Sequence, residues 1–317
     1  LGNIAIGQMM AFMQYAMQII MSFLMIAMIA IMLPRASVAA NRIYEVLSME
    51  VKISDPKNPE SFDENKKGLV EFKNVTFKYP GANEAVLENI SFTAKPGETT
   101  AFIGSTGSGK STLINLIPRF YEVTDGKIEV DGVDIRNVNQ HDLRDKIGLV
   151  PQKGLLFSGT IRSNLTYGAP DASDEELEEV IKIAQAKEFI DQKEKRLDDP
   201  ISQGGTNVSG GQKQRLAIAR AIAKKPEIFI FDDSFSALDF KTDAKLRNEL
   251  NKMIEKTRST VLIVGQRIAS IMSANQIIVL DEGKIVGKGT HDELMKNCKV
   301  YQEIAYSQLS KEELGHE

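Results

Sequence analysis

The segment that most restricts the fold of this chain is residues 104–111, which read GSTGSGKS. A short apolar run typical of a strand, residues 101–103, precedes it, and a helical pattern over residues 112–117 follows. A strand, a glycine-rich loop ending in Lys-Ser and a helix together form a phosphate-binding P-loop. Glycines let backbone N–H groups turn inward around phosphates, and the helix N-terminus adds favourable partial charge. The sequence therefore predicts an α/β nucleotide-binding domain.

The P-loop also predicts which side chains bind the phosphates and the metal ion. We expect Lys110 to reach the β- and γ-phosphates and Ser111 to ligate Mg²⁺. The apolar run of residues 228–231 ends in Asp232, where P-loop enzymes place the carboxylate that completes the Mg²⁺ site. An apolar strand ending in Asp is weak evidence by itself, and it gains weight because a P-loop precedes it.

The N-terminal segment has a different character. Residues 1–34 contain no Asp, Glu, Lys, Arg or His, and residues 4–33 are mostly apolar. A bilayer span needs about 20 residues, and roughly 30 helical residues reach about 45 Å, so we expect a membrane-spanning helix. A buried helix of a soluble protein would be shorter, and a signal peptide would have a basic region ahead of it. Arg35 and Arg42 follow the segment and predict that its C-terminal end lies in the cytoplasm.

Polar side chains recur along one face of this helix at Gln14, Gln18 and Ser22. Such groups in a membrane helix face a partner helix or a water-filled cavity. Ordinary helix packing and a substrate-lining face both explain the pattern.

Composition limits the other function classes. The 317 residues carry 39 Lys and Arg against 43 Asp and Glu, and a net charge of -4 argues against nucleic acid as the main partner. The single cysteine, Cys298, excludes an intramolecular disulfide and fits a reducing, cytosolic compartment. Because the chain begins with Leu, we expect it to be a fragment of a longer protein.

Four regions are expected along the chain. Residues 1–48 form a membrane helix and its cytoplasmic extension, and residues 49–68 form a polar linker with two prolines. The nucleotide-binding domain covers residues 69–312, and residues 313–317 are a C-terminal tail. Continuously apolar runs within this domain are expected of parallel strands covered on both faces; they are residues 147–150, 228–231 and 261–264.

A third motif, VSGGQKQR at residues 208–215, begins a helix that is predicted to run to about Ala223. A Ser-Gly-Gly helix start is either a plain N-cap or a second anion site. With this motif the chain resembles the ATP-binding cassette (ABC) family, whose signature is LSGGQ. The resemblance covers nearly the whole chain, because the uncharged helix matches the last transmembrane helix of exporters in which membrane and ATPase domains are fused.

The resemblance implies a fold and a set of site residues. The fold is an ABC cassette of the P-loop NTPase class: a RecA-like parallel sheet core, an antiparallel β subdomain and an α-helical subdomain. Tyr79 matches the aromatic residue that stacks on adenine, Gln152 matches the Q-loop, and residues 236–239 match the D-loop. The residues implied in binding ATP are Tyr79, Gly104, Ser105, Thr106, Gly107, Ser108, Gly109, Lys110, Ser111, Thr112, Ser209, Gly210, Gly211, Gln212 and Asp239. Those implied in binding Mg²⁺ are Ser111, Gln152 and Asp232.

Two positions depart from the family pattern. Where the family usually has a catalytic Glu, this chain has Asp233, whose carboxylate sits about 1.5 Å further back. A misplacement near 1 Å can cost about 10²-fold in rate. Where the family has a switch His, this chain has Gln266, which cannot become cationic at neutral pH. Asp233, Gln266, Gln152 and Lys110 are thus the expected catalytic residues of a degenerate site, and neutral drift in a working site is the alternative.

In ABC dimers each ATP lies between the P-loop of one subunit and the signature helix of the other. A degenerate P-loop side with a near-consensus signature resembles one half of heterodimeric multidrug-type exporters, and residues 231–245 resemble such subunits from Gram-positive bacteria. The resemblance implies an ATPase at a bacterial cell membrane, with its cassette on the cytoplasmic face and a second half-transporter subunit and the lipid bilayer as partners. A homodimeric exporter with slow sites and a non-transporting, ATP-binding regulatory module are the alternatives.

Overall fold

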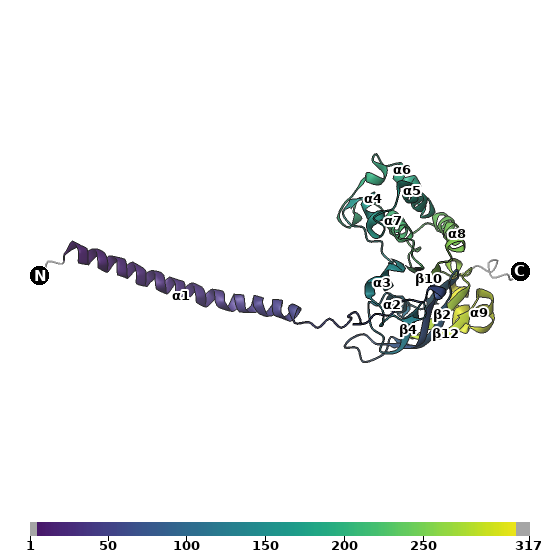
Figure 1. Cartoon of the computed structure of the whole chain (residues 1–317), viewed down its shortest axis with the longest axis horizontal. Coiled ribbons are helices and arrows are strands. Elements are labelled where there is room, and N and C mark those ends of the chain that lie inside the picture. The colour runs from purple at the N-terminus through teal and green to yellow at the C-terminus, as the bar shows by residue number, and fades with distance from the viewer. Residues whose placement is uncertain (1–4, 309–317) are drawn as a thin grey trace. The chain divides into compact units, whose positions relative to one another are not determined.

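The computed structural model of the chain describes residues 5–308 and contains two compact units. The first ends at Ser54, and the second begins at Asp55 (Figure 1). The predicted tail, residues 313–317, lies outside the described residues, as does Ile4 at the start of the apolar segment.

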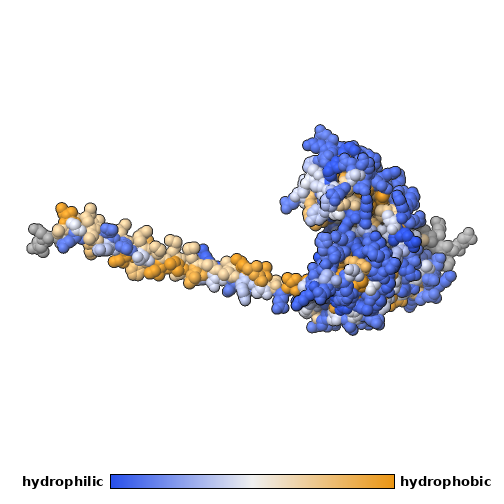
Figure 2. All heavy atoms as spheres, viewed as in Figure 1, coloured by the Kyte–Doolittle hydropathy of each residue, from blue (hydrophilic) through white to orange (hydrophobic). Residues whose placement is uncertain are grey.

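The first unit is one helix, α1 (Ile6–Leu47), of 42 residues. It continues through Pro34, so the predicted span and its cytoplasmic extension form a single helix. None of its residues is buried, and apolar side chains follow most of its length in Figure 2. By length and composition, α1 can cross a membrane.

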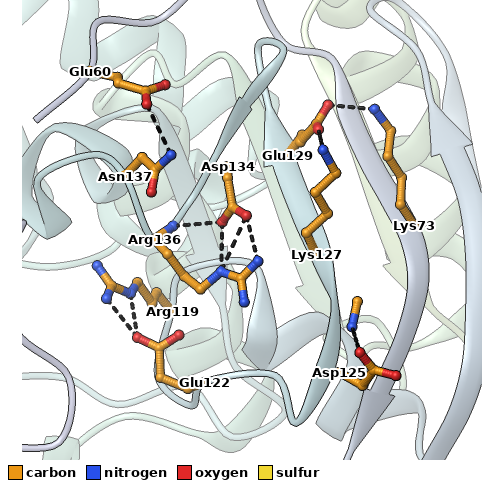
Figure 3. Close-up of polar contacts among 11 residues, drawn as sticks. Glu60, Lys73, Arg119, Glu122, Asp125, Lys127, Glu129, Asp134, Arg136 and Asn137 are labelled. Atoms are coloured by element: carbon orange, nitrogen blue, oxygen red, sulfur yellow. Dashed lines mark hydrogen bonds and ion pairs between the residues drawn. The ribbon is translucent and has the colours of Figure 1, made fainter.

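The predicted linker, residues 49–68, is divided between the two units. Its second part belongs to the second unit, where the Asp55 carboxylate accepts a hydrogen bond from the backbone N–H of Gln140. The backbone N–H of Glu60 donates to the carbonyl of Asn137, and the amide of Asn137 donates to the Glu60 carboxylate at 3.0 Å (Figure 3). A short turn, η1 (Glu64–Lys66), ends this segment.

The central sheet of the second unit has six strands in the order β12-β11-β3-β10-β9-β6. All neighbours are parallel except β11 and β12. The strands are β3 (Thr99–Gly104), β6 (Ile147–Val150), β9 (Ile228–Asp232), β10 (Thr260–Val264), β11 (Gln276–Asp281) and β12 (Lys284–Gly289). The three apolar runs expected to be buried strands are β6, β9 and β10. Because parallel strands end at the same edge, the P-loop, Asp232 and the segment after β10 come together there.

The second sheet is antiparallel, in the order β2-β1-β4-β5. Its strands are β1 (Val70–Phe77), β2 (Leu87–Ala94), β4 (Asp125–Val130) and β5 (Val133–Asp134). Asp131 and Gly132 form the hairpin turn with φ of 52° and 80°, left-handed conformations that an Asp-Gly pair favours in such a turn. Ion pairs line its outer face, where Lys73 and Lys127 both contact Glu129 (Figure 3).

The helical part lies to one side of the two sheets in Figure 1. It contains α4 (Ile161–Leu165), α5 (Asp174–Ile183), α6 (Lys187–Asp191) and α7 (Gly210–Ala223). Ser173 and Glu176 form a capping box at the start of α5. The other elements are α2 (Lys110–Leu116), α3 (Gln140–Asp145), α8 (Phe240–Thr257), α9 (His291–Asn297), α10 (Lys299–Gln308), β7 (Gly159–Thr160), β8 (Pro200–Ile201), η2 (Thr166–Gly168), η3 (Arg196–Asp198), η4 (Gln203–Gly205) and η5 (Ile268–Ser270).

The P-loop helix α2 packs between the two sheets. Leu113, Ile114 and Leu116 on α2 are fully buried in a cluster that includes strand residues of both sheets. This packing fixes the direction of α2, and with it the loop that leads into the helix. The parallel core, the antiparallel subdomain and the helical subdomain confirm the predicted fold class.

Candidate nucleotide-binding site

The P-loop connects β3 to α2, and its backbone requires glycine at two positions. Gly104 has φ of 155°, and a Cβ there would lie 2.0 Å from the carbonyl oxygen of Leu280. Gly109 has φ of 95°, and a Cβ there would lie 2.7 Å from the side chain of Leu87. Both left-handed conformations and both close approaches exclude larger residues. The chain therefore curves tightly around the space at the N-terminus of α2.

The ammonium group of Lys110 lies within this loop. Its Nζ donates hydrogen bonds to the carbonyls of Gly104 and Ser105, at 2.9 and 2.7 Å. Burial lowers the pKa of Lys110, and the nearby carboxylates of Asp233 and Asp232 oppose that effect. The two carboxylates and the loop carbonyls together hold the Lys110 ammonium group at the place where the sequence predicts the phosphates to bind.

Ser111 and Asp232 form the pair expected to bind Mg²⁺. The hydroxyl of Ser111 donates to Oδ1 of Asp232 at 2.9 Å, across 121 residues of sequence. Burial raises the pKa of Asp232, and the Ser111 hydrogen bond opposes that shift. Mg²⁺ is commonly held by one or two carboxylates together with nucleotide phosphates, and a hydroxyl beside a carboxylate supplies suitable oxygens. In the described part of the chain there is no cluster of three or more His, Cys, Asp or Glu residues that could hold a metal without phosphates.

Asp233 occupies the centre of the predicted catalytic group. Its Oδ2 accepts hydrogen bonds from Nε2 of Gln152 at 3.3 Å and from Nε2 of Gln266 at 2.8 Å. The structure thus brings the three residues together from the ends of β6, β9 and β10. Whether Gln152 also ligates Mg²⁺ stays a prediction.

The backbone holds Asp233 in one orientation. Its φ of 46° is left-handed, a conformation that Asp tolerates better than most residues. Its N–H donates to the carbonyl of Val264 at 3.0 Å, and its carbonyl accepts from the hydroxyl of Ser236 at 2.8 Å. Only 8% of the residue is exposed. Burial raises the pKa of the Asp233 carboxyl, whereas the hydrogen bond from Gln152 lowers it.

Asp233 and Gln266, the two departures from the family pattern, are therefore hydrogen-bonded to each other. A carboxylate has about four acceptor positions, so two amide donors on Oδ2 leave Oδ1 able to accept a proton from water. Gln266 presents an amide nitrogen, a donor only, to Asp233. The amide can neither take up a proton nor supply a positive charge near a phosphate.

Tyr79, the residue expected at adenine, lies beside the P-loop helix. Its hydroxyl is 3.0 Å from the hydroxyl of Thr112, and its ring packs edge-on against Phe77 and Tyr121. Tyr121 was not among the predicted residues. It is 37% exposed and lies far from Tyr79 in sequence, so only the folded chain places it next to the predicted adenine position.

The signature segment begins α7 with a complete capping box. The Ser209 hydroxyl accepts from the N–H of Gln212, and the Gln212 side chain accepts from the N–H of Ser209. A Cβ on Gly211 would lie 3.4 Å from the carbonyl of Ala237, so the D-loop packs against this helix start. Asp239, the last D-loop residue, caps α8 by accepting from the N–H of Thr242 at 3.0 Å. The N-cap explanation is thus realised, and anion binding at the same helix start stays a prediction.

Gln214 makes contacts at the site that the sequence motifs did not predict. Its side chain is almost completely buried, accepts from the N–H of Gly154 at 2.8 Å and donates to the carbonyl of Pro151 at 3.1 Å. These bonds join the signature helix to the backbone on both sides of Gln152. Only the Gln-x-Gln spacing after Gly211 could have suggested a second functional glutamine.

The fold and this site define a P-loop NTPase of the ABC cassette type. The family model described as ABC transporter matches residues 87–236. The second unit is therefore similar to the ATP-binding cassettes of ABC transporters.

Relatives extend this similarity over the whole chain. An uncharacterized ABC transporter ATP-binding protein of Mycobacterium tuberculosis is 47% identical over 317 residues, which cover 99% of this chain and 54% of that protein. A Beta-(1-->2)glucan export ATP-binding/permease protein of Rhodopseudomonas palustris is 44% identical over 246 residues, 78% of this chain and 41% of that protein.

Among solved structures, a bacterial Atm1-family ABC exporter with ATP bound superposes with a TM-score of 0.85 at 30% identity. The match covers 98% of this chain and 54% of that one. The chain spans about half the length of these relatives.

Proposed function

We propose that this chain is the C-terminal part of a bacterial exporter half-transporter, and that it couples ATP binding and hydrolysis to export. The P-loop, the Ser111–Asp232 pair and the signature helix supply the ATP chemistry, and α1 supplies a membrane attachment. The names of the relatives, which include an exporter and an export ATP-binding/permease protein, support this assignment. The cassette would then lie on the cytoplasmic face of the cell membrane.

We also propose that the chain's own site hydrolyses ATP slowly, and this proposal rests on the contact between Asp233 and Gln266. Asp233 is one methylene short of the usual Glu, and its partner is an amide. A base set back by about 1.5 Å and a neutral γ-phosphate contact both weaken transition-state stabilisation. The two residues responsible, Asp233 and Gln266, are joined by one hydrogen bond of 2.8 Å.

In this account the signature segment serves a different subunit. Ser209 and the two glycines that follow it match the family signature, and Ser209 forms a complete N-cap at the start of α7. A half-transporter with a weak P-loop side and an intact signature pairs best with a subunit that has the opposite combination. We therefore propose a heterodimer, in which hydrolysis occurs mainly at the site formed by the partner's P-loop and this chain's signature.

A homodimeric exporter with slow sites is the second candidate, because all residues needed for binding are present in this chain. A non-transporting module is disfavoured by α1, because this helix has the length and composition of a membrane span. The transported substrate is not defined by one helix.

The test is the ATPase activity of the full-length protein, purified alone and together with candidate partner half-transporters. The heterodimer account predicts low activity alone and a large increase in the assembled complex. A fully active homodimer would refute it, and failure to bind Mg²⁺-ATP in either form would refute the ATPase assignment itself.

A further inference from the structure

The last described residue, Gln308, bridges the end of α10 to the segment that carries Gln266. Its Oε1 accepts from the backbone N–H of Ile268 at 2.8 Å, and its Nε2 donates to the backbone carbonyl of Gln266 at 2.8 Å. One side-chain amide therefore fixes two backbone groups that are two residues apart. We call residues 265–268 the switch segment.

The switch segment has little other backbone support. Gly265 donates to the carbonyl of Phe102 at 3.1 Å, and the next backbone bonds along the chain begin with the carbonyl of Arg267, which accepts from Ser270. Within residues 5–308, Gln308 is the partner of both the Gln266 carbonyl and the Ile268 N–H. Loss of this side chain would leave the segment held mainly from its two ends.

The helix that presents Gln308 is anchored in the cassette. Tyr301 and Ala305 on α10 are fully buried, and the Tyr301 hydroxyl lies 2.8 Å from Nδ1 of His291. These contacts belong to a cluster that also contains strand residues of β3 and β11. The end of α10 is thus a fixed point relative to the central sheet, although Gln308 itself is exposed.

We propose that Gln308 is a positioning residue for ATP hydrolysis at this chain's own site. It fixes the Gln266 backbone, and the Gln266 side chain in turn donates to Asp233. The inference rests on the proposed ATPase function, and it adds the C-terminal helix to the parts that set the geometry of the catalytic carboxylate. Gln308 touches neither the P-loop nor Tyr79 in this structure, so it sets the rate of hydrolysis and leaves ATP affinity unchanged.

The test uses the full-length transporter assembled with its partner, with the partner's own P-loop lysine replaced so that residual hydrolysis reports this chain's site. Gln308→Met keeps the length of the side chain and removes both hydrogen bonds. We expect single-turnover hydrolysis to fall about fivefold, the factor that one net hydrogen bond represents, with the Kd for ATP unchanged. Gln302→Met is the matched control, because Gln302 lies on the same helix and donates to Met295. It should leave hydrolysis within about twofold of wild type.

A second measurement separates geometry from activity. Hydrogen exchange at the Ile268 amide should accelerate in Gln308→Met. It should stay near the wild-type rate in Gln308→Glu, because that variant keeps an acceptor for this N–H. Hydrolysis should still fall in Gln308→Glu, because its carboxylate cannot donate to the Gln266 carbonyl.

The inference would be overturned by unchanged hydrolysis in Gln308→Met, by an equal loss in Gln302→Met, or by unchanged exchange at Ile268 in Gln308→Met. A parallel loss of ATP affinity in Gln308→Met would mean a general structural role and would also overturn it. A wild-type complex that binds no ATP would instead count against the proposed function.

Discussion

Restoring the usual pair of catalytic residues should raise hydrolysis at this chain's own site, and the two changes should act together. Asp233→Glu advances the carboxylate by about 1.5 Å toward a Gln266 nitrogen that is only 2.8 Å away, so the longer side chain alone must push this amide aside. Gln266→His alone leaves the carboxylate set back. We expect each single variant to gain less than about tenfold and the double variant to gain about 10²-fold, or about 2.7 kcal/mol of transition-state stabilisation.

The assay is single-turnover ATP hydrolysis in the assembled transporter, resolved by site. Residues in direct contact are expected to be non-additive by about 0.5–3 kcal/mol, so the double-mutant cycle measures their coupling. Asp233→Glu with Gln266→Asn is the control, because it makes room for Glu without supplying an imidazole. Thermal unfolding must be followed in parallel, because Glu at the left-handed φ of 46° at position 233 lowers the free energy of unfolding by about 1 kcal/mol. If the double variant gains nothing beside an intact partner signature, the two departures do not limit this site.

Three further outcomes follow from the geometry. Tyr79→Ala should weaken ATP binding by about 1–3 kcal/mol without abolishing it, and an unchanged affinity would remove Tyr79 from the site. Tyr79→Phe loses only the contact with Thr112 and should bind ATP almost normally. Because a base must be deprotonated and burial raises the pKa of Asp233, the rate of hydrolysis should fall as the pH is lowered. Gln152→Ala removes a hydrogen bond that lowers this pKa, so the acid limb of the pH–rate profile should move to higher pH, and a shift to lower pH would contradict this. Gln214→Leu leaves two backbone groups unpaired at about 1–3 kcal/mol each, so the Tm should fall by several degrees, and an unchanged Tm would mean that water replaces both bonds.

Sequence patterns predicted the strands and the phosphate loop because these depend on local chemistry. Continuously apolar runs identified β6, β9 and β10, and glycine spacing located the P-loop where the structure has it. Asp232 was predictable because parallel strands that follow a P-loop strand end at the same edge.

The glutamine contacts could not be predicted in this way. Gln214 reaches Gly154 across 60 residues, and Gln308 reaches Gln266 across 42. An isolated amide has no periodicity, and its partners are backbone groups, which leave no trace in the sequence. Such contacts are set by the packing of α7 and α10 on the sheet, and only the folded chain places them.

We propose that this chain's signature serves the productive site while its own P-loop serves the slow one. The most direct measurement compares Gly211→Asp with Lys110→Ala in the assembled transporter, with dimer formation checked separately. Gly211→Asp puts a negative charge at a helix N-terminus that should receive phosphate, and Gly211→Ala controls for size, because the added Cβ meets only the Ala237 carbonyl at 3.4 Å and Leu238 at 3.9 Å. We predict that Gly211→Asp nearly abolishes ATPase activity, whereas Lys110→Ala leaves a measurable fraction. Loss of hydrolysis in Lys110→Ala with activity retained in Gly211→Asp would contradict the account and place the working catalytic centre in this chain.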